Sequence, residues 1–163
     1  MAEGPNYQEY LDAADLERAI PGTAGNYRRT SDPTINYNCL AHAVGVSWGW
    51  FDPEPGCAGY YWPVGVKREW SLPAIRKVLE DFGFKEECDD SCLEDGYEKV
   101  AIYIDKDDTP AHFARQLENG RWTSKCGELI DIEHETLECI ECDEYGTATH
   151  YVKRKRRVSA VAE

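Results

Sequence analysis

The sequence predicts an α+β domain in which N-terminal helices pack on a small antiparallel sheet. Two helix patterns occupy the first half of the chain, at residues 6–19 and 71–82. Short apolar strand patterns, separated by turn-forming residues, follow at 100–104, 111–117 and 121–125. Helices first and an antiparallel meander afterwards are typical of this fold class.

Both helix patterns carry boundary signals. Asn6 is a suitable N-cap for the first helix, and Pro21 follows its end. The second helix has Ser71 as its N-cap, Pro73 in its first turn and Gly83 just past its end. Serine or asparagine at the cap, proline in the first turn and glycine after the last turn are the residues that helix ends favour.

The remaining segments predict loops, one further turn and one further strand. Residues 22–37 and 84–95 are polar and resemble loops, and 118–120 predict a hairpin turn. Residues 131–140 are acidic and predict a short helical turn, whereas 147–153 predict the last strand.

Composition limits the classes of function. A chain of 163 residues fits one domain, which we place at 1–157, with a short tail at 158–163. The net charge of -13 argues against nucleic acid and anionic membranes as partners. No apolar stretch is long enough to span a bilayer, and residues 1–5 lack the features of a secretory signal. The cysteine count, 7, is odd, so we expect a cytoplasmic protein with reduced thiols and no cofactor; the oligomeric state stays open.

Cys39 is the residue around which a functional site is expected. It follows Asn38, a good N-cap, and precedes small and apolar residues suited to a buried helix that ends near Gly49. Unpaired N–H groups and the helix dipole at such a position stabilise a thiolate, so we expect a lowered pKa. A small buried cysteine in a packed helix is the alternative interpretation.

His112 is the candidate base for this thiol. It begins the second predicted strand, where a sheet edge can meet the first turn of a helix. Ser124 on the return strand, or Asp131 after it, would orient the imidazole. Asn36 or Asn38 would donate a side-chain amide to an oxyanion. His112 as a buried histidine bonded to the backbone is the alternative.

This order of residues resembles the papain-like cysteine peptidase superfamily, in its compact form with NlpC/P60, CHAP and transglutaminase-like members. The chain more closely resembles an uncharacterised bacterial family that shares the blocks at residues 37–41, 61–63, 96–103, 111–117, 120–125 and 131–134. The superfamily resemblance implies a compact papain-like fold, a Cys39 nucleophile and a His112 base. It gives no unambiguous match for a third catalytic residue.

Aromatic side chains near Cys39 predict a groove for a substrate. Trp48, Tyr61 and Trp62 would line this groove, and His42 is expected on the helix surface. The resulting hypothesis is a thiol hydrolase or acyl transferase that acts on a peptide, another amide or a thioester. The alternative is a catalytically inactive binding module of the immunity type, with a protein partner.

Two further signals compete with this hypothesis. Cys88 and Cys92, together with Cys139 and Cys142, would supply four thiolates for a structural zinc ion, but acidic neighbours disfavour it. The basic run at 153–157 is typical of a solvated strand end and tail. We therefore predict no metal site.

Overall fold

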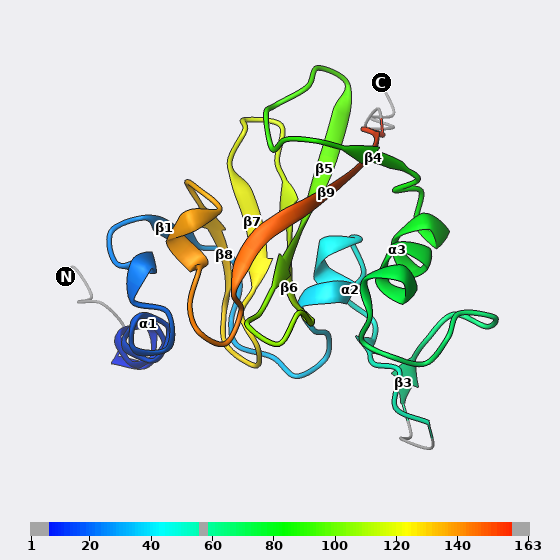
Figure 1. Ribbon diagram of the computed structural model, residues 1–163. Coiled ribbons are helices and arrows are strands. Elements are labelled where there is room, and N and C mark those ends of the chain that lie inside the picture. Colours follow the sequence, from blue (N-terminus) through cyan, green and yellow to red (C-terminus); the bar gives the residue numbers. More distant parts are fainter. Residues whose placement is uncertain (1–6, 56–58, 158–163) are drawn as a thin grey trace, which may run out of the picture.

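The computed structural model describes residues 7–55 and 59–157, and it shows an α+β fold built on one seven-stranded sheet (Figure 1). The strands lie in the order β1-β8-β7-β6-β5-β9-β4, and every neighbouring pair is antiparallel. Their bounds are β1 Tyr27–Arg29, β4 Glu86–Cys88, β5 Tyr97–Ile104, β6 Pro110–Gln116, β7 Trp122–Lys125, β8 Asp131–His134 and β9 Thr147–Lys155. The predicted α+β class and the antiparallel sheet are therefore confirmed, and the sheet is larger than expected.

The helices lie on both sides of this sheet (Figure 1). The α-helices are α1 Tyr7–Ala19, α2 Cys39–Ala43 and α3 Leu72–Asp81, and 3-10 turns occur at η1 Pro21–Thr23 and η2 Glu138–Ile140. A separate two-stranded parallel pair joins β2 Trp50–Phe51 to β3 Tyr60–Tyr61. None of the helices in the described ranges is long and apolar enough to cross a lipid bilayer.

Alternation along the central strands divides the core into two layers. Val100 and Ile102 of β5 face the cluster that includes α2 and α3, whereas Ala101 and Tyr103 face the cluster that includes α1 and η2. Successive side chains of a strand point to opposite faces, so one buried strand serves both layers. β5 is buried along almost its whole length for this reason.

Local signals predicted the longer elements. The Ser71 hydroxyl accepts a hydrogen bond from the Ala74 N–H at 3.2 Å, and Pro73 lies in the first turn of α3. The strands predicted at 100–104, 111–117, 121–125 and 147–153 correspond to β5, β6, β7 and β9. These elements combine periodic apolar residues with clear caps or turns, which is why sequence reasoning finds them.

The structure differs from the prediction at one helix end and in several short strands. α2 ends at Ala43 rather than near Gly49, because Gly45 adopts a φ of 85° and its N–H bonds back to His42. In the segment 131–140, predicted as a helical turn, residues 131–134 form β8 because β7 and β1 both pair with them, and only 138–140 form a helical turn, η2. The three-residue strands β1 and β4 lie within predicted loops and are too short for a pattern to appear. The tail predicted at 158–163 lies outside the described residues.

Gly146 lies where the chain turns into β9, and it tests how tightly this turn is packed. A Cβ atom there would lie 1.8 Å from the Ile104 carbonyl oxygen, and φ is +74°. We expect Gly146→Ala to lower the free energy of unfolding by about 3 kcal/mol or more. The backbone at Ile104 must move away from the new Cβ atom, and alanine must also adopt a left-handed conformation. Urea unfolding measures the change.

Gly25→Ala is the matched control for this substitution. Gly25 has a φ of +77°, but no heavy atom lies within 4 Å of its added Cβ. Gly25→Ala should therefore lower the free energy of unfolding only by the cost of placing alanine in a left-handed conformation, about 1 to 2 kcal/mol. Equal losses in the two variants would contradict the tight packing of Gly146 on β5.

Candidate functional site

Asn38 fixes the position of Cys39 at the first turn of α2. Its Oδ1 accepts hydrogen bonds from the Ala41 N–H at 3.3 Å and the Phe51 N–H at 3.1 Å, and its Nδ2 donates to the Phe51 carbonyl at 2.6 Å. One side chain thus caps the helix and ties it to β2. The Asn38 amide predicted for an oxyanion is thus already engaged, although Asn38 lines the pocket beside Cys39, whereas Asn36 is exposed and absent from that lining.

The Cys39 thiol lies against the start of β6. Backbone N–H groups of Phe113, Leu40 and Cys39 itself point at the sulfur, and the Lys125 ammonium lies nearby. These groups favour the thiolate, yet burial outweighs them and raises the pKa of the Cys39 thiol to about 11. The lowered pKa expected from the helix position is therefore wrong, because desolvation of the sulfur is the larger effect.

His112 is fully buried and belongs to a chain of hydrogen bonds. Its Nε2 lies 3.1 Å from the Ser124 hydroxyl, which lies 2.7 Å from Nε2 of His134. The other nitrogen of His134, Nδ1, lies 2.9 Å from the Thr136 carbonyl oxygen. The structure thus brings His112 and Ser124 together, as the sequence predicted.

This chain fixes which nitrogen of His112 carries a proton. The Thr136 carbonyl can only accept, so Nδ1 of His134 donates and its Nε2 accepts the hydroxyl proton of Ser124. The Ser124 oxygen then accepts from Nε2–H of His112. Nδ1 of His112 is left with its lone pair, and it has no hydrogen-bond partner among the described residues. Burial, with the charges of His134 and His42, lowers the pKa of His112 well below its usual value, so the ring is neutral.

Two tyrosines hold the imidazole in place. The Tyr145 ring stacks on it at a centroid distance of 4.2 Å and an angle of 14°, and the Tyr103 ring meets it edge-on at 5.2 Å. The Tyr103 hydroxyl donates to the Leu137 carbonyl at 2.7 Å. The ring therefore cannot turn without displacing a packed aromatic side chain.

Cys39 packs against the first half of β6, the strand that carries His112, but no hydrogen bond joins the two side chains. The β6–β7 ladder ends at the Arg115–Thr123 pair, and nearer the start of β6 the Phe113 N–H turns to the Cys39 sulfur. Tyr145 lines the same pocket as Cys39 and stacks on His112. Cys39 packs against the α2 and α3 layer, however, whereas the rings around His112 belong to the other layer.

Asp131 does not orient His112, contrary to one of the two sequence-based alternatives. Its carboxylate accepts the Tyr37 hydroxyl and lies 3.5 Å from Nδ1 of His42 and 3.9 Å from the Lys125 ammonium. His42 also lies 2.8 Å from the Thr123 hydroxyl, so it is not the surface residue that was expected. This buried network holds α2 on strands β7 and β8.

A pocket of about 300 Å³ opens beside Cys39. Its described lining consists of Asn38, Cys39, Trp50, Asp52, Trp70, Thr109, Pro110, Ala111, Phe113, Gly127, Glu144 and Tyr145. The predicted groove residues Trp48, Tyr61 and Trp62 are absent from this lining. Trp48 is 67% exposed and packs edge-on against Tyr61, whereas Trp62 is buried with its Nε1 bonded to the Lys67 carbonyl.

Sequence reasoning missed several residues of the site. Trp50 and Trp70 belong to a region rich in aromatic residues, and the sequence does not show which of these residues line the pocket. Lys125 is a fully buried lysine in a strand whose four residues are all buried, and no local pattern separates it from an exposed lysine. His134 and Tyr145 join the site only through the β7–β8 register and the turn before β9.

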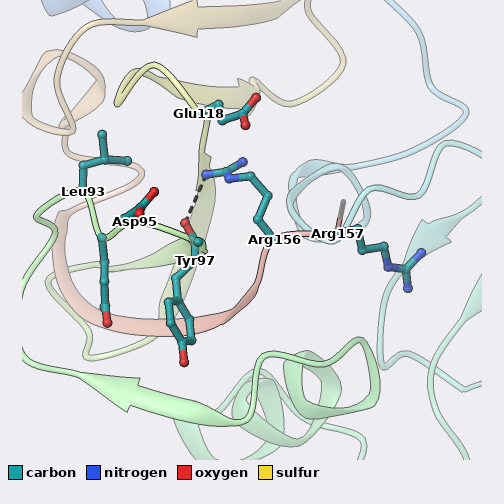
Figure 2. Close-up of a pocket in the computed structure, with 8 residues that line it drawn as sticks. Leu93, Asp95, Tyr97, Glu118, Arg156 and Arg157 are labelled. Atoms are coloured by element: carbon teal, nitrogen blue, oxygen red, sulfur yellow. Dashed lines mark hydrogen bonds between the residues drawn. The ribbon is translucent and has the colours of Figure 1, made fainter. Parts of the chain in front are cut away.

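A second pocket lies at the far end of the sheet (Figure 2). Its lining mixes charges of both signs, and Arg156 is already engaged by the Tyr97 carbonyl at 3.2 Å and the Glu98 carboxylate at 3.3 Å. Tyr97 is six residues from Tyr103, the β5 partner of His112, which corresponds to about 20 Å along the strand. This pocket is therefore remote from Cys39.

No three histidine, cysteine or acidic side chains in the described part of the chain are placed to hold a metal ion. The Cys139 thiol donates instead to the Thr136 carbonyl at 3.1 Å. Among the cysteines of the predicted zinc alternative, Cys92 is exposed.

The buried histidines should make stability depend on pH. Burial lowers the pKa of His42 and His134 to about 4 from 6.5, and it lowers that of His112 as well. The unfolded chain therefore binds more protons below pH 6.5, so stability is complete above that pH and is lost as the pH falls towards 4. We expect the free energy of unfolding to fall between pH 7 and 5, by up to about 1.4 kcal/mol per pH unit for each histidine.

Urea unfolding at several pH values measures this slope. His42→Gln should make it shallower by removing one of the buried groups. A free energy of unfolding that is constant from pH 7 to 5 would contradict the burial of neutral histidines.

The buried Asp131–Lys125 pair should respond differently to single and double substitution. Asp131→Asn leaves the buried Lys125 ammonium without its carboxylate and should cost about 3 kcal/mol or more. Asp131→Asn combined with Lys125→Met should cost less than Asp131→Asn alone, because no buried charge remains. Asp15→Asn, which breaks an exposed ion pair with Arg18, is the control and should change stability by less than about 0.5 kcal/mol.

Comparison with known proteins identifies a family. The model of a domain of unknown function, DUF7689, matches residues 28–153, which include the described strands from β4 to β8, Cys39 and His112. No curated protein and no solved structure matches the chain. Since the family model covers most of the chain, the protein belongs to the DUF7689 family.

Proposed function

We propose that this protein is a thiol hydrolase or acyl transferase that acts on an amide or a thioester through Cys39 and His112. The observation that carries the proposal is the orientation of His112. Its Nε2–H is committed to Ser124, and its Nδ1 is buried with no hydrogen-bond partner among the described residues. The next residue on β6, Phe113, points its backbone N–H at the Cys39 sulfur. Nucleophilic catalysis needs a base held by a polar group and within reach of a thiol. For catalysis, the Cys39 side chain must therefore leave its contacts in the α2 and α3 layer and move to the face of β6 that carries His112.

The resemblance to the papain-like superfamily supports the same assignment. The helix-borne Cys39, the strand-borne His112 and the polar Ser124 on the next strand follow the order of that superfamily. Ser124 takes the place of the residue that orients the imidazole, and Asp131 does not compete for it because its carboxylate is engaged by Tyr37, His42 and Lys125. A compact papain-like fold is accordingly part of the proposal.

The reaction would begin from a neutral pair. With the Cys39 pKa near 11, the thiol is protonated at neutral pH, and it must lose its proton as it attacks. The Cys39 side chain rotates towards Nδ1 of His112, which takes the S–H proton while the sulfur bonds to the substrate carbonyl carbon. The imidazolium then gives this proton to the leaving amine or thiol, and a thioester remains on Cys39.

A second nucleophile completes the cycle. Water gives a hydrolase and an amine or thiol gives a transferase; in each case Nδ1 of His112 takes the proton of the nucleophile and returns it to the Cys39 sulfur. The backbone N–H groups of Cys39 and Leu40 lie against the sulfur and replace Asn38 as donors to the oxyanion.

A binding module on the same scaffold is the second candidate. The observation in its favour is the resting state of the pair, in which the thiol has a raised pKa and no hydrogen bond joins it to His112. Exposed apolar side chains near β2 and β3, among them Trp48 and Val64, offer such a module a contact surface. This candidate predicts a protein partner and no acyl intermediate.

Acylation of the purified, reduced protein by p-nitrophenyl acetate tests the enzyme. We expect a burst of p-nitrophenol and an acetyl group on Cys39, found by mass spectrometry as a hydroxylamine-sensitive thioester. Cys39→Ala should abolish the burst, and His112→Gln should slow acylation by about 100-fold or more because the base is lost. Circular dichroism shows whether the His112 variant is folded.

Cys92→Ala is the matched control, because Cys92 is an exposed thiol outside the site. Its burst should equal that of the wild type. Acetylation confined to Cys92, or a full burst in Cys39→Ala, would refute the enzyme and favour the binding module.

A further inference from the structure

The pocket beside Cys39 has a lining suited to a cation. Two indole rings, of Trp50 and Trp70, and two carboxylates, of Asp52 and Glu144, line it. Its described lining contains no lysine or arginine. Aromatic faces and carboxylates both attract positive charge, the former through the ring quadrupole and the latter directly.

The two carboxylates are not neutralised within the described part of the chain. Asp52 uses one oxygen to accept the Glu54 N–H at 2.9 Å, and it forms no ion pair there. Glu144 forms neither a hydrogen bond nor an ion pair with the described residues. Glu98 on β5, by contrast, is paired with Arg154 at 2.6 Å. The charge of the pocket is thus available to a ligand.

The indole rings are held in fixed positions by other aromatic side chains. Trp50 stacks on Tyr60 at a centroid distance of 6.5 Å and an angle of 24°. Trp70 meets Trp62 edge-on at 5.7 Å, and Trp62 is itself anchored to the Lys67 carbonyl. Both rings are half-buried, so each keeps some accessible surface. Rigid rings lose little entropy when a cation binds to them.

We infer that the substrate of the Cys39 site carries a guanidinium or ammonium group, as an arginine-like or lysine-like acyl donor does, and that Asp52, Glu144 and the two indoles bind it. A volume of about 300 Å³ matches one amino-acid side chain beside the bond that reacts. The net charge of -13 draws cations towards the protein from a distance. The inference rests on the proposed function for the reaction at Cys39, but binding of the cation is measurable without turnover.

Titration calorimetry on the Cys39→Ala protein tests the binding. The probes are N-acetyl-arginine amide and N-acetyl-citrulline amide, which share a shape and differ in charge. We expect the arginine probe to bind about tenfold more tightly, and N-acetyl-lysine amide reports whether an ammonium group suffices. In Asp52→Asn/Glu144→Gln, added to the same background, the preference for arginine should be lost.

Asp143→Asn is the matched control, because Asp143 neighbours Glu144 in the chain but is not part of the lining. It should keep the preference. Equal binding of the arginine and citrulline probes, no binding of either, or a preference that survives the double substitution would overturn the inference.

Turnover by the wild type separates this inference from the proposed function. The substrates are p-nitrophenyl esters of N-acetyl-arginine and N-acetyl-citrulline. Preferential arginine binding with no turnover that depends on Cys39 would support the cation site and refute the enzyme. Turnover of both esters at equal kcat/KM, with equal binding of the amides, would support the enzyme and refute the cation site.

Discussion

A carbonyl oxygen can accept a hydrogen bond but cannot donate one, and the Thr136 carbonyl therefore sets the direction of every bond that leads to His112. The proton of His134 points to Thr136, that of Ser124 to His134 and that of His112 to Ser124. The side chains of His112, Ser124 and His134 are buried, which strengthens these hydrogen bonds relative to bonds made in water. The residues of β6, β7, β8 and the turn before η2 are thus coupled, and together they decide that Nδ1 of His112 carries the lone pair.

Two opposing effects act on the pKa of the Cys39 thiol. Backbone N–H groups at the start of α2 favour a thiolate, which is why the sequence predicted a reactive Cys39. Packing against β6 removes water from the sulfur, and this desolvation is larger. A helix N-terminus therefore does not by itself identify an activated cysteine, because the solvent exposure of the sulfur depends on the strands beneath it.

The sequence predicted those parts of the site that are encoded locally. Cys39 after an asparagine cap, His112 at a strand start and Ser124 across a hairpin follow from patterns within a few residues. The partners of Asp131 do not, because they depend on the register that places Lys125 opposite it and on the helix that brings His42 to it. β8 was missed for a related reason: its residues belong to an acidic segment that was predicted as a helical turn, and only pairing with β7 on one side and β1 on the other makes it a strand.

The order of the strands has a consequence for how the chain acquires its fold. β9 comes last in sequence but lies inside the sheet, between β5 and β4, and it pairs with β5 over nearly its whole length. A nascent chain therefore cannot complete the sheet until about residue 155 has left the ribosome, and until then β5 has an unpaired apolar edge. Such edges pair readily with other chains, so interrupted synthesis would produce aggregation-prone fragments rather than a smaller folded domain.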